Sequence, residues 1–225
     1  MSNEKPFEII VLGPPVSGKG TQAELLAATF DIPHISSGQI LHPIKDDPAH
    51  PLSLEVAKYM NEGKLVPSEI VDRLILERIK KDDCRFGFVI DGYPRTLSQA
   101  EVISGAVDLD YVFLIHVSDE VIVERMSGRR VCKNGHSWHL KYSPTKKEAV
   151  CDTCGEPLFQ RDDDKEEVVR QRLLVYHGEM APIIEFFESK KILIRLDGEK
   201  HIEGVFQQFV RHLVFDLRNK LNLVK

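Results

Sequence analysis

The sequence contains no apolar run approaching the roughly 20 residues that a helix needs to cross a membrane. It also lacks an excess of positive charge, because 30 lysines and arginines stand against 35 aspartates and glutamates and give a formal net charge of −5. Its first residues have neither the basic cluster nor the apolar stretch of a secretory signal. We therefore expect a cytoplasmic protein with no membrane partner and no nucleic-acid partner.

Cysteine is scarce, with four residues in 225, and a reducing cytosol makes disulfides the less expected use. Three of the cysteines form, with a histidine, two short knuckles separated by fourteen residues, and this spacing suits a structural, tetrahedral Zn²⁺ site. The candidate ligands are Cys132, His136, Cys151 and Cys154. His139 is near enough to compete with His136 as the fourth ligand. The alternative is a decayed site, with Gly135 where a second sulfur would stand.

Apolar runs and helical periodicities alternate along the chain, which predicts one α/β domain with a parallel sheet. Expected strands cover 7–12, 32–35, 86–90, 111–117 and 192–196. Expected helices cover 22–30, 39–45, 52–62, 68–82, 97–105 and 119–127, followed by two apolar stripes of helical period at 169–187 and 206–217. Pro182 should kink the first of these two helices or divide it, and residues 218–225 should fray.

A glycine-rich segment, Gly13-Pro-Pro-Val-Ser-Gly-Lys-Gly-Thr21, joins the first expected strand to the first expected helix. The backbone N–H groups of such a turn and the positive end of the helix together form a cradle for phosphate. In this Walker A pattern Lys19 reaches the outer phosphates and Thr21 offers its hydroxyl to Mg²⁺. The alternative is an incidental glycine-rich turn, which the strand before it and the helix after it disfavour.

Arginine recurs near the expected strand ends and beside the cysteines, at Arg95, Arg125, Arg129, Arg161 and Arg172. Transfer of a phosphoryl group depends on positive charge placed around the moving group. Each arginine could instead be a solvated surface charge, which is the usual fate of this residue. Their positions near strand ends and beside the cysteines favour a role around the transferred phosphoryl group.

Further motifs follow the glycine-rich segment in order: Ser36-Ser-Gly38, Gly63-Lys-Leu-Val66, Asp91-Gly-Tyr-Pro-Arg-Thr96 with Gln99, Gly128-Arg-Arg-Val131, Trp138-His-Leu-Lys-Tyr-Ser-Pro144, Arg161-Asp-Asp163, Arg170-Gln-Arg-Leu173 and Asp197-Gly-Glu-Lys200. Together these motifs resemble the adenylate kinase family from Ile9 to about Leu213. The resemblance implies a P-loop core of the nucleoside monophosphate kinase type, with a five-stranded parallel sheet flanked by helices, at 1–35, 67–128 and 167–225. It also implies a helical AMP-binding flap at 36–66 and a small β-rich zinc lid at 129–166.

The resemblance further implies an activity, the Mg²⁺-dependent, reversible transfer of a phosphoryl group from ATP to AMP giving two ADP, by a monomer. Residues implied to bind ATP are Pro15, Val16, Ser17, Gly18, Lys19, Gly20, Thr21, Arg129, Trp138, Gly198 and Lys200. Residues implied to bind AMP are Ser37, His42, Lys64, Leu65, Val66, Gly92, Arg95, Gln99, Arg161 and Arg172. The implied catalytic group is Lys19, Asp91, Arg95, Arg125, Arg129, Arg161 and Arg172, with Asp91 holding magnesium through water.

Three residues depart from the pattern of the family. Val16 replaces a glycine of the phosphate loop, and a β-branched side chain is disfavoured there if the backbone needs a positive φ. Gln39 replaces an acid, and His42 replaces an arginine that meets the AMP phosphate, so we expect weak AMP affinity rather than none. The alternatives are a kinase for another nucleoside monophosphate and a nucleotide-binding sensor whose catalysis has faded. A zinc-dependent nucleic-acid binder is disfavoured by the acidic run at 162–167.

Overall fold

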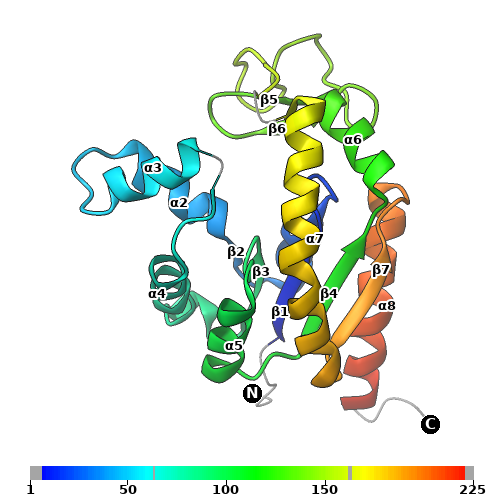
Figure 1. Cartoon of the computed structure of the whole chain (residues 1–225). Coiled ribbons are helices and arrows are strands. Elements are labelled where there is room, and N and C mark those ends of the chain that lie inside the picture. The colour runs from blue at the N-terminus through cyan, green and yellow to red at the C-terminus, as the bar shows by residue number, and fades with distance from the viewer. Residues whose placement is uncertain (1–6, 63, 162–163, 221–225) are drawn as a thin grey trace.

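The computed structural model describes residues 7–62, 64–161 and 164–220, with the side chains of all of these except Arg172 and 215–220. Within this part of the chain five strands form one parallel sheet in the order β2-β3-β1-β4-β7 (Figure 1). The strands are β1 (Phe7–Leu12), β2 (His34–Ser36), β3 (Gly87–Asp91), β4 (Tyr111–His116) and β7 (Leu193–Asp197). The predicted fold class is confirmed.

The central strand β1 places its side chains alternately on the two faces of the sheet, as the two-residue period of a strand requires. Ile10 and Leu12 belong to the core cluster on one face, whereas Ile9 and Val11 belong to the cluster on the other. All four are buried. Burial on both faces explains why this strand is a near-continuous apolar run in the sequence.

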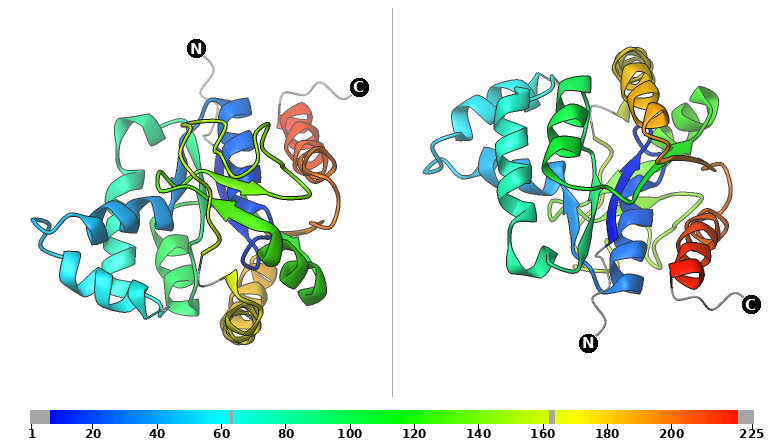
Figure 2. Two further views of the ribbon diagram at one scale, coloured as in Figure 1. Left: turned by 90° about the horizontal axis from the view of Figure 1, so that it is seen from above. Right: turned by 90° about the horizontal axis from the view of Figure 1, so that it is seen from below.

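Helices cover both faces of the sheet, so that the sheet is the middle of three layers (Figures 1 and 2). They are α1 (Lys19–Phe30), α4 (Ser68–Ile79), α5 (Leu97–Ala106), α6 (Asp119–Gly128), α7 (Glu166–Ser189) and α8 (Ile202–Lys220). Residues of α4, α5 and the C-terminal half of α7 pack with Ile10. Residues of α1, α6, α8 and the N-terminal half of α7 pack with Ile9. Among the helices of the described segments, none has the length and apolar character that a bilayer span requires.

Two segments between elements of this core carry further structure. The segment between β2 and α4 is called the flap and contains α2 (Ser37–Asp46) and α3 (Ser53–Asn61). The segment between α6 and α7 is called the lid and contains the antiparallel pair β5 (Arg129–Val131) and β6 (Ser137–His139). The flap stands to one side of the sheet, and the lid lies over the carboxyl end of β4 (Figure 1). Seen from above, the lid extends across the strand ends (Figure 2).

Of the two outcomes expected at Pro182, a kink or a division of the helix, the division is wrong, because α7 runs as one element from Glu166 to Ser189. Met180 and Ile183, on either side of the proline, are both buried in the same core cluster, so packing holds the helix together across the missing hydrogen bond. The last stripe forms α8 as far as Lys220, so the fraying expected for 218–225 is wrong at 218–220, and 221–225 lie outside the described residues.

Candidate active site and metal centre

The loop between β1 and α1 has the tight backbone of a phosphate cradle. The amide of Ser17 donates to the carbonyl of Pro14 at 3.2 Å, and Gly18 has a φ of 90°. A side chain at Gly13 would place its Cβ 2.7 Å from the Ser17 hydroxyl and 3.0 Å from the Ile115 carbonyl, so only glycine fits. The Ser17 hydroxyl is buried and has no hydrogen-bond partner among the described residues. An orphaned hydroxyl in such a loop fits a ligand oxygen.

Val16 lies in the same loop with a φ of 50°. This is the left-handed region, in which a β-branched residue is a genuine outlier. The backbone conformation that a glycine would adopt at no steric cost is therefore imposed on a valine. The sequence analysis expected a valine to be disfavoured here if the backbone needs a positive φ, and the backbone has a positive φ. The loop therefore carries local strain.

Lys19 and Asp91 both lie at the start of α1. The ammonium of Lys19 donates to the carbonyl of Pro14 at 3.1 Å, which keeps it against the loop. A Cβ at Gly20 would lie 3.4 Å from Oδ2 of Asp91. The carboxylate at the end of β3 is therefore beside Gly20, the residue that precedes Thr21, whose hydroxyl is expected to bind Mg²⁺. A hydroxyl and a carboxylate are oxygen ligands of the kind that Mg²⁺ prefers, so the pair fits the ion.

Asp91 is buried and is held by His34, which the sequence interpretation did not single out, and by Ser36, which belongs to the motif Ser36-Ser-Gly38. Nε2 of His34 lies 2.7 Å from Oδ2, and the hydroxyl of Ser36 donates to Oδ1 at 3.2 Å. Burial raises the pKa of Asp91, but the His34 hydrogen bond, the charge of Lys19 and the Ser36 hydrogen bond outweigh it and leave the pKa below its usual value. The carboxylate is thus kept ionised. The one sequence signal for His34 was its place in the expected strand at 32–35, which the structure pairs with β3.

Four of the residues implied to bind AMP lie together between the end of β3 and the start of α5: Ser37, Gly92, Arg95 and Gln99. The Ser37 hydroxyl donates to the carbonyl of Gly92 at 2.7 Å, and Nε of Arg95 donates to the same carbonyl at 2.7 Å. Oε1 of the buried Gln99 accepts the backbone N–H of Arg95 at 2.7 Å. These contacts connect the flap, the end of β3 and α5 in one network.

Other expected AMP residues lie on the flap, apart from this network. Val66 is buried, whereas Lys64 is exposed and pairs with Glu62 at 2.7 Å. Leu65 is partly exposed, at 36%. His42 lies on α2 with an exposed side chain. Gly63 of the same motif lies outside the described residues.

The expected arginines near the lid are engaged differently. Arg129 forms a bidentate pair with Asp164, whose carboxylate is completely buried. Arg125 donates to the carbonyl of Gly198 at 2.9 Å. Arg161 lies at the end of the lid, and the side chain of Arg172, on α7, is outside the described part of the structure. The Asp164 partner was missed because the acidic run at 162–167 was used only as evidence against a nucleic-acid partner.

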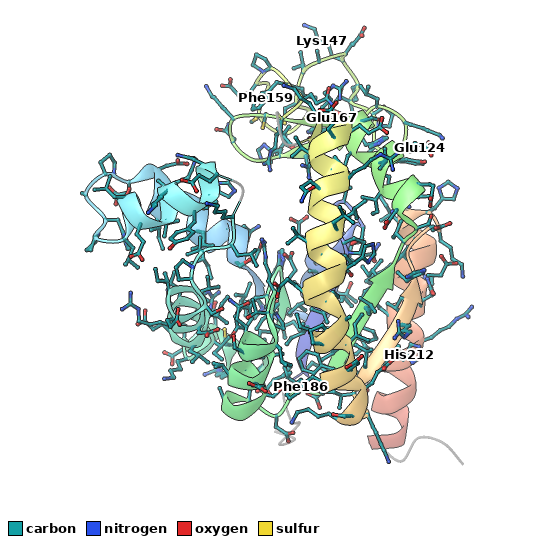
Figure 3. All side chains as sticks on the ribbon, viewed as in Figure 1. Glu124, Lys147, Phe159, Glu167, Phe186 and His212 are labelled. Atoms are coloured by element: carbon teal, nitrogen blue, oxygen red, sulfur yellow. The ribbon has the colours of Figure 1, made fainter. Side chains whose placement is uncertain are left out.

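The base of the lid is attached to α6 through Glu124. Its carboxylate accepts hydrogen bonds from Nζ of Lys141 at 2.8 Å and from the hydroxyl of Tyr142 at 3.1 Å. Figure 3 labels Glu124 on α6 beneath the lid and Lys147 at the outer tip of the lid. The ring of Tyr142 also lies 5.7 Å from the guanidinium carbon of Arg125. The lid therefore contacts the helix that carries one of the candidate catalytic arginines.

Gly198, one of the residues implied to bind ATP, follows β7. Its N–H donates to the carbonyl of His116 at 2.8 Å. A Cβ at Gly198 would lie 2.3 Å from the Ile115 side chain, so a larger residue does not fit. Lys200 is exposed, with its ammonium 3.7 Å from Asp197. The turn is thus shaped by backbone groups, which suits recognition through the main chain.

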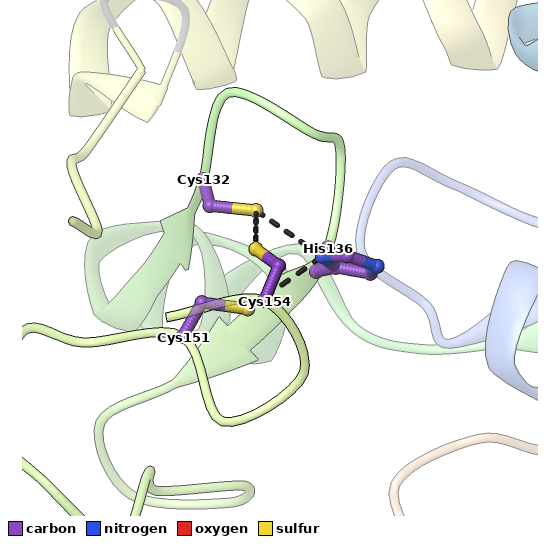
Figure 4. A group of neighbouring side chains, drawn as sticks. All are labelled: Cys132, His136, Cys151 and Cys154. Carbon is purple, nitrogen blue, oxygen red and sulfur yellow. Dashed lines mark hydrogen bonds between the residues drawn. The ribbon is translucent and has the colours of Figure 1, made fainter. Parts of the chain in front are cut away.

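The four candidate metal ligands lie together in the lid. The ligand atoms of Cys132, His136, Cys151 and Cys154 all lie within 4.8 Å of one another (Figure 4). Three sulfurs and one imidazole nitrogen are the donor set of closed structural zinc sites, so the residues fit Zn²⁺.

His139 is not part of the cluster. Its Nδ1 accepts the N–H groups of Lys141 and Tyr142, each at 3.0 Å, and its ring lies against Gly128.

Trp138 contributes to the same cluster from β6. Its indole N–H donates to Sγ of Cys151 at 3.3 Å. Burial disfavours the thiolate of Cys151, but the indole and the backbone amides of Cys154 and Thr153 outweigh burial and lower the pKa of Cys151 to about 6. A thiol that ionises readily is prepared to bind a cation.

A family model described as Adenylate kinase matches residues 11–192. The chain belongs to the adenylate kinase family. It is 45% identical over 214 residues to an "Adenylate kinase" of Caldicellulosiruptor bescii, which covers 92% of this chain and 99% of the relative. It is likewise 45% identical over 214 residues to an "Adenylate kinase" of Lachnospira eligens, covering 92% of this chain and all of the relative. An "Adenylate kinase" of Alkaliphilus oremlandii is 44% identical over 218 residues, covering 94% of this chain and all of the relative.

Proposed function

We propose that this member of the adenylate kinase family transfers the terminal phosphoryl group of ATP to AMP, reversibly and with Mg²⁺, to give two molecules of ADP. The observation that carries the proposal is the phosphate loop, with Lys19 against it and the ionised Asp91 beside Gly20, in a chain that resembles adenylate kinases over more than nine-tenths of its length. A nucleoside monophosphate brings its own ionised phosphate as the nucleophile. The protein therefore needs to supply position and positive charge rather than a general base.

Each half of the site has a distinct task in this proposal. The loop amides from Pro15 to Thr21 and the ammonium of Lys19 bind the ATP phosphates. Thr21 and Asp91 would hold Mg²⁺, which would offset negative charge on those phosphates. On the other side, Arg95 meets the AMP phosphate and the amide of Gln99 reads the adenine edge.

The lid and flap complete the site when they close over substrate. Arg125, Arg129, Arg161 and Arg172 surround the transferred phosphoryl group in the closed form. For Arg129 this requires that it leave, or share, its pair with Asp164. Closure excludes water from the reacting phosphates and so limits hydrolysis. We propose that the core, 36–66 and 129–166 are the three bodies of this motion.

The test is steady-state formation of nucleoside diphosphate from ATP and Mg²⁺, with AMP, GMP, CMP and UMP each varied over a wide range. We expect turnover with AMP at a high KM and much lower kcat/KM with the other three monophosphates. Higher kcat/KM with GMP, CMP or UMP would replace the proposal with another nucleoside monophosphate kinase.

A second candidate is a nucleotide-binding sensor with little catalysis. The strained Val16 and the histidine at position 42 favour it, because both lie where phosphates bind. The charged residues at the expected site of transfer disfavour it, since a protein that only binds nucleotide does not need them. Normal ATP binding measured by calorimetry, without turnover at saturating AMP, would decide for the sensor. We further propose that the protein is monomeric and cytoplasmic and that it does not bind nucleic acid.

A further inference from the structure

We propose that Trp138 is a positioning residue of the metal centre, whose indole N–H holds the Cys151 sulfur and slows the loss of zinc. The inference concerns the lid alone and goes beyond the proposed activity. Its starting point is the 3.3 Å contact from Nε1 of Trp138 to Sγ of Cys151. Cys151 is 1% exposed, so water has little access to compete for that sulfur.

The charge of the metal centre explains why such a donor matters. Three thiolates and one neutral imidazole around Zn²⁺ leave a net charge of −1, which is unfavourable where the ligands are buried. Cys132 and Cys151 are both buried. Each N–H group directed at a thiolate offsets part of the excess negative charge, and residues that contact ligands in this way tune metal affinity.

Backbone amides supply some of the N–H donors that offset the negative charge of the thiolates. The amides of Asn134 and His136 donate toward the sulfur of Cys132. The amides of Thr153 and Cys154 donate toward the sulfur of Cys151. The Trp138 indole adds a side-chain donor to Cys151. Since a side-chain donor can be removed without changing the backbone, its contribution can be measured separately.

The register of the lid strands supports this assignment over a role in covering ATP. Trp138 is paired with Arg130, and His139 is paired with Arg129. Directly opposed residues of an antiparallel pair share one face, and successive residues alternate. Trp138 therefore lies on the opposite face of the strand pair from Arg129, the arginine expected at ATP. The indole serves the metal face, and β6 links the metal to the strand that carries Arg129.

The experiment uses the full chain loaded with zinc and two replacements of the indole. Trp138→Phe removes the N–H and part of the ring. Replacement of the same residue by 3-benzothienylalanine, in which sulfur takes the place of the N–H, removes the donor and keeps the shape. Tyr142→Phe is the control, because it removes a hydrogen bond of the same lid, to Glu124, without touching the cluster.

Two measurements decide the matter. The first is the rate of zinc transfer to an excess of a colorimetric chelator, which we expect to rise about tenfold in both replacements and to stay unchanged in the control. The second is the thiolate-to-metal charge-transfer band of the Co²⁺-substituted chain. Loss of the N–H donor raises the energy of the sulfur lone pairs, so the band should move to longer wavelength.

The proposal is overturned if the benzothienylalanine chain releases zinc at the wild-type rate and keeps the wild-type cobalt band. It is equally overturned if Trp138→Phe raises the KM for ATP while zinc release is unchanged. Should Trp138→Phe fail to fold, the isosteric replacement still decides between the two outcomes. None of these results depends on which monophosphate the enzyme accepts, so failure here is distinguishable from failure of the proposed function.

Discussion

Among single residues, Val16 combines a left-handed backbone with a β-branched side chain in a loop that is expected to bind phosphate. Strain of this kind costs on the order of 1–3 kcal/mol and is retained where the surroundings enforce it. The neighbouring Ser17 hydroxyl, buried without a partner among the described residues, is a second unfavourable feature of the same loop. A bound nucleotide would give the Ser17 hydroxyl a hydrogen-bond partner, but it would not relieve the backbone strain at Val16.

Replacing this valine tests the strain directly. We expect Val16→Gly to raise the free energy of unfolding by about 1 kcal/mol, since the relief of strain exceeds the entropy that glycine loses on folding. Val175→Gly is the matched control, because Val175 is 52% exposed in the regular helix α7. There the same substitution should destabilise by about 0.5 kcal/mol. Urea unfolding without nucleotide measures both, and a loss of stability in Val16→Gly would contradict the strain argument.

His42 offers a second test at the scale of a residue. An arginine binds phosphate with a permanent charge and two parallel hydrogen bonds, whereas a histidine is mostly neutral at pH 7. We expect His42→Arg to lower the KM for AMP roughly ten- to a hundredfold, equivalent to about 1.5–3 kcal/mol, with the KM for ATP unchanged. His50→Arg adds the same charge elsewhere on the flap and should leave both constants unchanged. Equal AMP affinity in the wild type and His42→Arg would remove the argument.

These two residues also show what the sequence can and cannot predict. Val16 and His42 were identifiable because they stand at fixed positions of recognised motifs. The partners of Asp91 and Arg129 were not identifiable, because His34 and Asp164 come close only after the strands and the lid have folded. The role of Trp138 was missed for the same reason. Its contact with Cys151 depends on the register of two short strands.

At the scale of elements, α7 shows that packing can override a local signal. Pro182 cannot donate a backbone hydrogen bond within the helix, yet α7 continues through it. We expect Pro182→Ala to raise the free energy of unfolding by about 1–3 kcal/mol through the restored hydrogen bond. Pro48→Ala, in the turn between α2 and α3, should give no such gain. A thermal melt of each variant checks this, and a lower midpoint for Pro182→Ala than for the wild type would refute it.

We expect the lid to depend on a bound metal because it has little core of its own. Of the described residues between 129 and 161, only Val131, Cys132 and Cys151 are buried, and two of these are candidate metal ligands. We expect removal of zinc by a chelator to expose the lid to proteases while the sheet and its helices stay protected. Limited proteolysis with mass spectrometry locates the cuts. Equal protection of the lid with and without zinc would show that the metal is not structural.

At the scale of the whole molecule, Asp91 links stability to pH. The pKa of Asp91 is lowered in the folded state, so the carboxylate stabilises the fold above the pKa of an unfolded aspartate, about 3.9, and this contribution disappears as the pH falls below that value. The difference in unfolding free energy between the wild type and Asp91→Asn should therefore be constant from about pH 7 to 5 and shrink below about pH 4. Urea titrations across this range test it. A difference that stays constant into acid would show that Asp91 does not contribute in this way.

The sheet was predictable as a whole because each strand carries its own signal. The runs at β1, β3 and β4 are apolar throughout, since both faces of the sheet are covered. The lid strands were less predictable, because β5 and β6 have three residues each and one of the six side chains is buried. Short strands of this kind are defined by pairing and by the metal cluster rather than by periodicity.

The strand order has a consequence for the nascent chain. The central strand β1 is synthesised first, but its neighbours in the sheet are β3 and β4. Phe7 therefore cannot pair until Gly87 has left the ribosome, and Ile9 cannot pair until Tyr111 has done so. The outer edge of β4 then stays open until Leu193–Asp197 has been translated. An apolar strand that emerges early and pairs late is exposed to chaperones and to aggregation during translation.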